Sequence, residues 1–500
     1  MTLHRRWTVC LLSLALSLAG TLFSQPKSIT ILHTNDLHAS FVPHEAFWVR
    51  QTPRPMVGGF QELFFTVDSL RKSKSPTLLL DAGDVMTGNP ITERQYKGAY
   101  GGALFEMMNQ IGYDVWCPGN HDFDVSQDNL AALTSIAKFP TVCANLVPEK
   151  GLEALHAEPY VVLERGGLRI GVIGIISQQL YGLVNQNNLV GIRVLSPAEE
   201  LQKYIDELRS KTDLLIALTH EGFEEDSVLA REVRDLNVIV GGHSHTRLKK
   251  PREVNGVIIV QAGSNCENLG ELSLTVEGHH VVSFNGHLDQ LWVRPDRPAT
   301  PLGRFIDSTQ AAIEKDYSEV IGTLGDEWVR GSGPNSMGEF IADAQREAAG
   351  ADVGFMNDHG IRKDQAAGAI TKMDLFEILP FRNLLTTFEV SGKELVDVVR
   401  YTLEKKPAIQ VTGLSAEWKR GADGSIAIVK VEVAGRPLDE GKTYTCAASD
   451  YFVGEAKHYI GLEVIRPFYL RTTVFDAVEQ AIRKAKLIRN SVPYRLTEVQ

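Results

Sequence analysis

The fold of this chain is constrained most by six short apolar runs in its first half, separated by amphipathic stretches with helical periodicity. Each run is rich in Val, Ile and Leu, as strands buried on both faces of a sheet are. Alternation of such runs with helical stretches is the pattern of a layered α/β domain. The runs cover residues 29–33, 77–80, 170–176, 214–219, 238–240 and 257–260.

The length of 500 residues predicts two domains, because single cores rarely grow beyond about 250 to 300 residues. A boundary is indicated at residues 293–301, where three prolines in nine residues disfavour a helix or a central strand. We therefore predict a first domain at 26–292, a linker with a helix at 293–319, and a second α/β domain at 320–500. The helices expected after the boundary cover residues 304–317, 336–349, 393–403 and 474–486.

The N-terminus has the layout of a secretory signal peptide. Arg5 and Arg6 precede an apolar run at 7–18, and small and polar residues follow it. The run is shorter than the roughly 20 residues of a membrane span. An uncleaved membrane anchor is the alternative. We expect a signal peptide at 1–25, no stable membrane span, and a mature chain that is periplasmic or secreted.

The net charge of the chain limits the classes of ligand that it can bind. The formal net charge of -11 becomes -13 once Arg5 and Arg6 are removed, and an acidic surface repels the backbone of nucleic acids. A nucleic-acid polymer is therefore excluded as the main partner. Small anionic substrates remain compatible, because bound divalent cations reverse the field inside a site.

Cysteine usage does not indicate a disulfide framework. Beyond the signal peptide the chain has four cysteines, which is sparse for an exported protein of this size. We expect them to be mostly free residues of the core. They are Cys117, Cys143, Cys266 and Cys446.

Five polar blocks lie just beyond the expected strands, where open α/β sheets place their ligands. Alone, each block is weak, because a histidine at a strand end is more often an ordinary polar residue than a ligand. Five blocks that all draw on Asp, His and Asn are hard to explain in that way. Their candidate ligands are Asp36, His38, Asp84, Asn120, His220, His243 and His245.

The residue types in these blocks indicate the kind of metal site. Mixed carboxylate, imidazole and amide ligands suit borderline divalent ions such as Zn²⁺, Mn²⁺ or Fe²⁺, rather than Ca²⁺ or a structural zinc bound by thiolates. The set has too many ligands for one ion. Two ions that share a carboxylate clamp the attacking and leaving oxygens of a displacement at phosphorus.

The order Asp-x-His, Gly-Asp, Gly-Asn-His-Asp, His and Gly-His-Ser-His resembles the calcineurin-like metallophosphoesterases. Residues 32–38, Gly360-Ile-Arg362 and Leu379-Pro-Phe-Arg-Asn383 resemble the secreted 5'-nucleotidase/UDP-sugar hydrolase family. The resemblance covers almost the whole mature chain. It implies a four-layer α/β/β/α metallophosphoesterase sandwich, followed by a C-terminal α/β domain that recognises the substrate.

The resemblance implies a phosphoric monoester hydrolase of nucleotide catabolism that converts nucleoside 5'-monophosphates to nucleoside and phosphate by direct attack of a metal-activated water. UDP-sugars and cyclic nucleotides are further expected substrates. Two ligand sets that share one carboxylate are implied, with Zn²⁺, Mn²⁺ or Co²⁺ as the ions. One set is Asp36, His38, Asp84 and His245, and the other is Asp84, Asn120, His220 and His243.

The histidine next to Asn120 has a separate implied role. By resemblance, His121 pairs with Asp124 and faces the phosphate or the leaving oxygen as a charged imidazole. The alternative for Asp124 is a solvated carboxylate in a turn. Arg362 is implied to approach the substrate near its phosphate, and Asn383 to lie near the nucleoside pocket.

The chain departs from its relatives where they hold the base between two aromatic rings. Ala408 replaces the first ring, Phe452 is the candidate for the second, and His458 stands where an aspartate is expected. Nucleotide specificity is therefore left open. The alternatives are a metallohydrolase for another phosphoester or a thiosulfo-ester, and a binding or adhesion protein with structural metals. The sequence does not define an oligomeric state.

Overall fold

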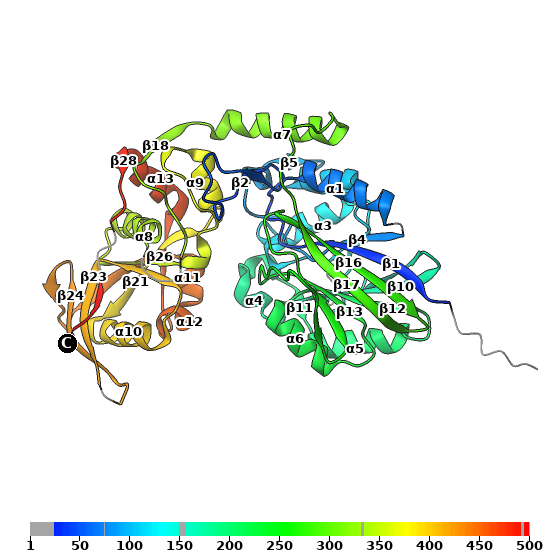
Figure 1. Cartoon of the computed structure of the whole chain (residues 1–500). Coiled ribbons are helices and arrows are strands. Elements are labelled where there is room, and N and C mark those ends of the chain that lie inside the picture. The colour runs from blue at the N-terminus through cyan, green and yellow to red at the C-terminus, as the bar shows by residue number, and fades with distance from the viewer. Residues whose placement is uncertain are drawn as a thin grey trace, which may run out of the picture.

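The computed structural model describes residues 25–74, 76–149, 157–331, 335–421, 423–491 and 495–499. Apart from Gln25, the predicted signal peptide lies outside the described residues. The chain forms two lobes side by side, joined along one side by helix α7 (Pro301–Tyr317) (Figure 1). Among the described residues, no helix is long and apolar enough to cross a membrane.

The first lobe contains two large sheets, and all six apolar runs of the sequence are strands within them. The first sheet has the order β17-β16-β1-β4-β7 and the second β14-β15-β13-β12-β10-β9. The strands of the first are β1 (Lys27–Thr34), β4 (Thr77–Asp81), β7 (Val115–Trp116), β16 (Asn268–Glu277) and β17 (His280–Gln290). Those of the second are β9 (Tyr160–Arg165), β10 (Leu168–Ile176), β12 (Leu214–His220), β13 (Val238–Gly241), β14 (Arg252–Val254) and β15 (Val257–Val260).

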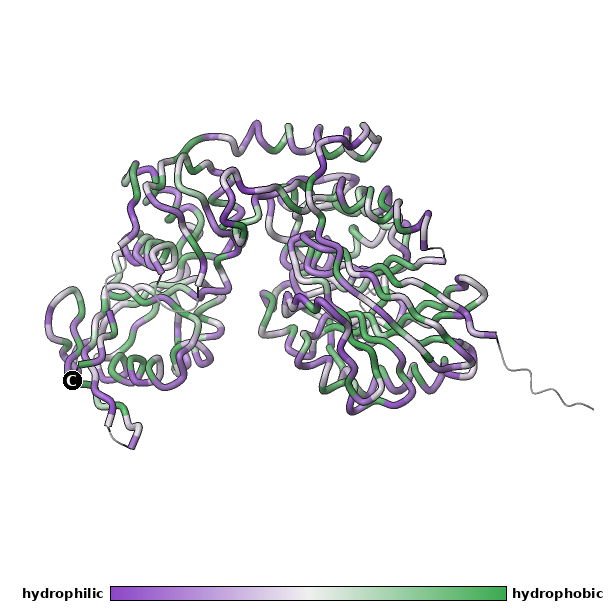
Figure 2. The backbone as a smooth tube through the Cα atoms, in the orientation of Figure 1, coloured by the Kyte–Doolittle hydropathy of each residue, from purple (hydrophilic) through white to green (hydrophobic). Residues whose placement is uncertain are grey.

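The two sheets pack face to face, and helices cover their outer faces. Buried side chains from both sheets, such as Ile31, Leu80 and Leu218, form one apolar layer between them. Figure 2 shows that hydrophobic residues are concentrated along these strands. The helices on the first sheet are α1 (Phe60–Ser73), α2 (Gly102–Ile111) and α3 (Gln127–Ile136), and those on the second are α5 (Pro197–Leu208) and α6 (Phe223–Glu232). The predicted four-layer sandwich is confirmed.

The second lobe is built around a five-stranded sheet of order β22-β19-β26-β21-β27. Its strands are β19 (Val353–Asn357), β21 (Leu384–Ser391), β22 (Ile409–Thr412), β26 (Thr443–Ser449) and β27 (Phe468–Thr473). Its helices are α8 (Ser336–Ala349), α9 (Lys372–Ile378), α10 (Gly392–Lys405), α11 (Asp450–Gly454), α12 (Ala456–Ile460) and α13 (Val474–Ala485). The α/β class predicted for this half is confirmed, and helices α8, α10 and α13 match their predicted ranges to within two residues.

Smaller elements complete both lobes. A four-stranded sheet contains β23 (Leu414–Arg420), β24 (Ile426–Val433), β25 (Arg436–Pro437) and β29 (Leu496–Glu498). A three-stranded sheet contains β18 (Val320–Leu324), β20 (Gly368–Thr371) and β28 (Leu487–Ile488). The short elements of the first lobe are β2 (His44–Glu45), β3 (Met56–Val57), β5 (Gln95–Tyr96), β6 (Ala99–Tyr100), β8 (Leu146–Pro148), β11 (Ile192–Val194) and α4 (Leu180–Leu183).

The proline-rich segment is anchored to the first lobe before α7 begins. The guanidinium of Arg297 donates two hydrogen bonds to Oε2 of the buried Glu62 in α1, at 2.9 and 3.0 Å. Helix α7 then starts at Pro301, with Thr300 as its cap. It starts three residues before the predicted position, because proline fits the first turn of a helix. The four cysteines of the described chain are free and buried, as predicted.

Candidate metal centre

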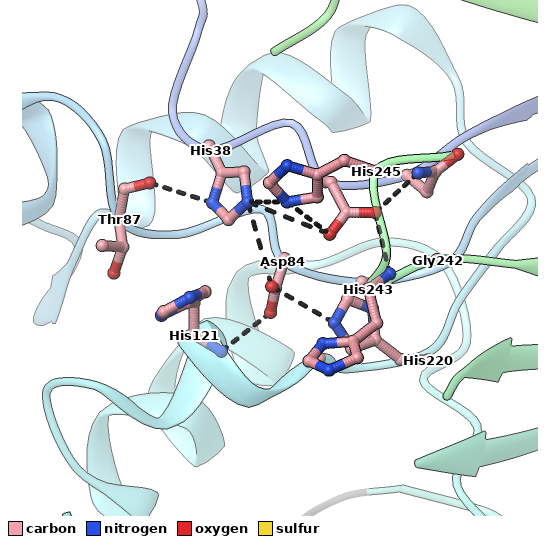
Figure 3. A network of polar contacts seen from close by, with 12 residues as sticks. His38, Asp84, Thr87, His121, His220, Gly242, His243 and His245 are labelled. Carbon is pink, nitrogen blue, oxygen red and sulfur yellow. Dashed lines mark hydrogen bonds and ion pairs between the residues drawn. The ribbon is translucent and has the colours of Figure 1, made fainter. Parts of the chain in front are cut away.

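The seven candidate ligands come together at one edge of the sandwich, where the carboxyl ends of the parallel strands of both sheets meet. Asp36 and His38 follow β1, and Asp84 follows β4. Asn120 follows β7 in the first sheet. In the second sheet His220 is the last residue of β12, and His243 and His245 follow β13. Figure 3 shows the side chains of His38, Asp84, His220, His243 and His245 turned toward one another.

Most of these residues occupy an uncommon backbone conformation. Asp36, His38, Asp84, His243 and His245 have φ angles of 50°, 45°, 57°, 75° and 52°, in the left-handed region that non-glycine residues rarely adopt. Such conformations cost on the order of 1 to 3 kcal/mol each and persist where the surrounding structure enforces them. The turns are therefore held in place by contacts with one another.

Two backbone hydrogen bonds and one carboxylate hold the ligand-bearing turns in these conformations. The amide of Asp36 donates to the carbonyl of Gly83, and the amide of His38 donates to that of Asp84, at 2.8 and 2.9 Å. The buried carboxylate of Asp122 accepts from four backbone amides at 2.8 to 3.0 Å. Those amides belong to Asp84, Val85, Met86 and Gly119. Asp122 thus ties together the loops that carry Asp84 and Asn120, a role that was not predicted from the sequence.

The first ligand group consists of Asp36, His38 and His245. Nε2 of His38 lies 3.0 Å from Nε2 of His245, which in turn lies 3.4 Å from Oδ1 of Asp36. Oδ2 of Asp84 lies 4.0 Å from Nε2 of His38. Four potential ligand atoms therefore face one small volume.

The second group consists of Asp84, His220 and His243. Oδ2 of Asp84 lies 3.2 Å from Nε2 of His220, so the same oxygen borders both groups. His220 donates from Nδ1 to the carbonyl of Ala82 at 2.6 Å, and the carbonyl of Thr87 lies 3.2 Å from Nδ1 of His38. With Nδ1 engaged in this way, each imidazole presents Nε2 to the centre.

Three buried atoms at this point make no hydrogen bond in the described part of the chain. They are Oδ1 of Asp36, Oδ1 of Asn120 and Nε2 of His220. Two of them have an ion-pair contact instead, because Nε2 of His220 lies 3.2 Å from Oδ2 of Asp84 and Oδ1 of Asp36 lies 3.4 Å from Nε2 of His245. A buried polar atom without a hydrogen bond costs about 1 to 3 kcal/mol, so three such atoms at one place indicate missing ligands. Oxygen and imidazole nitrogen donors fit a divalent transition metal or zinc. The donor set is therefore compatible with bound cations.

The charges within the centre favour ionised carboxylates. Burial would raise the pKa of Asp36, but the neighbouring histidines, chiefly His245, outweigh it and lower the pKa to about 2. Burial lowers the pKa of His243 to about 4. For His220, burial acts in the same direction, but the carboxylates of Asp84 and Asp36 prevail and raise the pKa to about 10.

His121 and Asp124 form a pair beside the ligand groups. Nδ1 of His121 lies 2.8 Å from Oδ2 of Asp124. The backbone amide of His121 donates to Oδ1 of Asp84 at 2.7 Å (Figure 3). Burial lowers the pKa of His121, but Asp124 and Asp84 outweigh it and the net shift is upward. The geometry therefore favours a protonated imidazole next to the centre. The catalytic role of the pair stays a prediction.

The second lobe reaches the centre through Arg362 and Phe381. Nη2 of Arg362 donates to Nε2 of His38 at 2.9 Å. The Phe381 ring lies 5.4 Å from the His121 ring, tilted by 31°, and the Arg362 guanidinium lies 5.8 Å from the Phe381 centroid. Phe381 belongs to one of the motifs that carry the family resemblance, but it was not predicted to be a residue of the site.

The structure contradicts the prediction that Phe452 stacks on the substrate. Its side chain is fully buried, with the ring of Phe355 at 5.5 Å and that of Tyr459 at 5.0 Å, both nearly parallel to it. Helix α11, capped by Ser449, turns Phe452 back onto the sheet. The neighbouring Tyr451 is half-buried, and its hydroxyl pKa is raised by burial, with a smaller contribution from Asp124 in the other lobe.

The other substrate-binding candidates lie in the second lobe without a direct contact that defines their role. Asn383 is half-buried between α9 and β21, two residues from Phe381, and its carbonyl accepts from the amide of Val474 at 2.9 Å. Ala408 precedes β22, and its carbonyl accepts from the amide of Asp358. The role of Asn383 stays a prediction.

Two family models match this arrangement of domains. The model described as calcineurin-like phosphoesterase matches residues 29–247, and the model described as 5'-nucleotidase, C-terminal domain, matches residues 319–462. The chain belongs to the 5'-nucleotidase family of calcineurin-like phosphoesterases. It is therefore a phosphoesterase. Membership of this metallophosphoesterase family implies divalent metal ions, and the ligand groups above are the candidate places for them.

Relatives match this member of the 5'-nucleotidase family over most of both chains. "Silent protein UshA(0)" of Salmonella typhimurium is 29% identical and covers 93% of this chain and 94% of its own. A 5'-nucleotidase of Vibrio vulnificus is 28% identical over 90% of this chain and 88% of its own. Among solved structures, the 5'-nucleotidase precursor of Thermus thermophilus has a TM-score of 0.79 at 26% identity, covering 95% of this chain and 99% of its own.

One structural neighbour bears on the alternative chemistry. The sulfate thiohydrolase SoxB of Thermus thermophilus has a TM-score of 0.78 and covers 94% of this chain and 96% of its own, but it is 16% identical. At that identity the likeness shows a shared fold alone. It does not favour sulfur-ester hydrolysis in this chain.

Proposed function

We propose that this protein hydrolyses nucleoside 5'-monophosphates to nucleoside and phosphate at a two-metal centre, as an enzyme of nucleotide catabolism outside the cytoplasm. The observation that carries the proposal is that Oδ2 of Asp84 borders both ligand groups. A charged His121 on one side and Arg362 on the other complete a site shaped for an anionic ester. We assign the metallophosphoesterase domain to 26–292, the linker with its helix to 293–319 and the substrate-binding domain to 320–500.

In this proposal the two ligand groups hold divalent cations, and Zn²⁺, Mn²⁺ or Co²⁺ fit the donors. Bound there, the cations supply the Lewis acidity that activates water and neutralises charge on the phosphoryl oxygens. Asp36, His38, Asp84 and His245 would hold one. Asp84, Asn120, His220 and His243 would hold the other.

The remaining side chains act on the ester itself. The Arg362 guanidinium, which lies 2.9 Å from Nε2 of His38, donates to the phosphoryl oxygens as a fixed fork. His121, held through Nδ1 by Asp124, keeps Nε2 free to give a proton to the leaving oxygen. Phe381 packs against His121 and limits the access of water to it.

The test is a reconstitution of the mature chain after removal of metals. We expect phosphate release from nucleoside 5'-monophosphates when Mn²⁺, Zn²⁺ or Co²⁺ is added separately, and none with the chelated protein. An Asn120→Ala protein purified in parallel controls for a contaminating phosphatase. Turnover of a thiosulfonate donor alone would assign sulfur-ester hydrolysis instead, and no turnover with any ion would favour a binding protein.

One observation favours a broader substrate range within this function. Neither position of the base clamp offers a stacking ring, because Ala408 has none and Phe452 is buried. Stacking on an aromatic ring is worth about 1 to 3 kcal/mol per base. The polar side chains of His359 and His458 are exposed in the second lobe. We therefore include UDP-glucose and a 2',3'-cyclic nucleotide in the panel and expect weak discrimination between bases.

A further inference from the structure

Thr87 contacts the metal-ligand group and the His121–Asp124 pair at the same time. It lies in the loop after β4 and is 7% exposed. Its carbonyl lies 3.2 Å from Nδ1 of His38, a contact drawn in Figure 3. Its hydroxyl donates to Oδ2 of Asp124 at 2.6 Å, the oxygen that also accepts from Nδ1 of His121 at 2.8 Å.

The backbone of Thr87 is strained at this position. Its φ angle is 66°, and a β-branched residue in the left-handed region is an outlier. Gly88 follows directly, and a Cβ there would collide with the carbonyl of His38. The turn is therefore packed against the backbone of His38. Such strain persists where the surrounding structure enforces it, often at functional sites.

We propose that Thr87 is a positioning residue, which aligns the His38 imidazole through its carbonyl and the Asp124 carboxylate through its hydroxyl. One residue thereby keeps the metal ligand and the proton donor in fixed relation. The proposal rests on the function proposed above. Oδ2 of Asp124 accepts two hydrogen bonds, and without the hydroxyl the carboxylate is free to rotate away from His121.

The hydroxyl is tested separately from the backbone with Thr87→Val, which keeps the volume, the branching and the carbonyl. We expect kcat for a nucleoside 5'-monophosphate to fall by about 10- to 100-fold, because general acid–base catalysis contributes about 10²- to 10⁴-fold. KM and the content of two metals per chain should stay unchanged. Thr87→Ser, which restores the hydroxyl, should bring kcat back to within about threefold of the original protein.

Thr92→Val is the matched control. Thr92 lies five residues further along the same connection after β4, in the short 3₁₀ helix Pro90–Glu93, and is also 7% exposed. Its hydroxyl donates to the carbonyl of Asn89 at 2.9 Å and not to the site. The same substitution there should leave kcat, KM and metal content unchanged. A loss in Thr92→Val equal to that in Thr87→Val would show that removing any buried hydroxyl from this loop is enough, and would overturn the proposal.

A comparison of two leaving groups distinguishes a positioning role of Thr87 from a purely structural one, which would affect both substrates equally. Nitrophenolate leaves without a proton, so Thr87→Val should lower kcat for p-nitrophenyl phosphate by less than about threefold. Equal losses on both esters, no rescue by serine, or loss of metal from Thr87→Val would each overturn the proposal.

A measurement without turnover separates this proposal from the proposed function. In zinc-loaded protein labelled with ¹⁵N-histidine, the Nδ1 proton of His121 is identified by its absence in His121→Ala. We expect this signal to move in Thr87→Val and to return in Thr87→Ser. An unmoved signal overturns the positioning role even if the enzyme is active, whereas a moved signal in a protein inactive on nucleotides supports the role and overturns only the proposed function.

Discussion

The metal-bearing edge of the first lobe and the facing surface of the second lobe are built in different ways. On the first lobe, five of the seven candidate ligands are held at left-handed φ angles by neighbouring turns. On the second lobe, Arg362, Phe381 and Asn383 are half-buried side chains of loops and helix ends. A cation requires several atoms within a few tenths of an ångström, so its ligands are fixed through the backbone. A substrate-binding surface is formed by side chains alone, and amino-acid substitutions change such a surface more easily than they change a backbone conformation.

The first prediction tests whether placement, rather than residue type, creates the metal site. Asp84→Asn keeps the volume and removes the charge that both groups share. We expect kcat/KM to fall by more than about 10⁴-fold and metal content to fall below two per chain, because one neutral amide cannot bridge two cations. Metal analysis and phosphate release measure both effects.

A third group of the same residue types provides the control for placement. Glu271, His287 and Asp289 could hold an ion by proximity, but His287 is exposed and Glu271 is already paired with Lys74 at 3.0 Å. His287→Ala should leave metal content and activity as they are. If Asp84→Asn kept both metals, or His287→Ala lost one, placement by the backbone would not be what distinguishes the metal centre from this third group.

The second prediction concerns Phe452, which resembles a substrate residue in sequence and is a core residue in the structure. Phe452→Ala removes a fully buried ring between Phe355 and Tyr459. We expect the free energy of unfolding to fall by about 3 to 5 kcal/mol, measured by urea denaturation. At a temperature where the variant remains folded, KM for nucleotides should change by less than about twofold.

Tyr451→Phe gives the comparison for that experiment, since it keeps the ring and removes a hydroxyl of a half-buried residue on the same helix. Its stability should stay within about 1 kcal/mol of the original. A large rise in KM with unchanged stability in Phe452→Ala would restore Phe452 to the substrate surface and remove the contrast between the lobes.

The same contrast explains what could be predicted from the sequence. The apolar runs determine the strands, and ligands at strand ends must meet where those ends meet, so the positions of Asp36, Asp84 and His220 followed from order alone. Phe452 could not be placed in that way, because a short helix turns one side chain inward and its neighbour outward. One residue of register separates the fully buried Phe452 from the half-buried Tyr451.

Contacts that depend on the tertiary structure could also not be predicted from the sequence. Thr87 and Asp122 are ordinary residues of a loop until the structure brings Asp124 and the backbone amides against them. Phe381 contacts His121 only because the two lobes face each other. The domain boundary stays a prediction, drawn from the three prolines in residues 293–301, which disfavour a helix or a central strand.

The last prediction distinguishes the lobes by their response to pH. Without metal, burial lowers the pKa of His220, but Asp84 and Asp36 outweigh it and raise the pKa to about 10. Below that pH the imidazole is protonated and must lose a proton to bind an ion, whereas His243, with a pKa of about 4, is already neutral at pH 7. Affinity for the ion at this group should therefore rise about tenfold per pH unit between pH 6 and 8.

Calorimetry in buffers of different ionisation enthalpy should show about one proton released per ion bound by the group of His220. Asp84→Asn removes the main charge that raises the pKa of His220, so the variant should release less than the original protein at the same pH. Arg362 in the second lobe stays charged throughout this range and adds no proton to the count. Binding without proton release at pH 7 would mean that His220 is neutral before the ion arrives, and that the carboxylates of Asp84 and Asp36 do not dominate its environment.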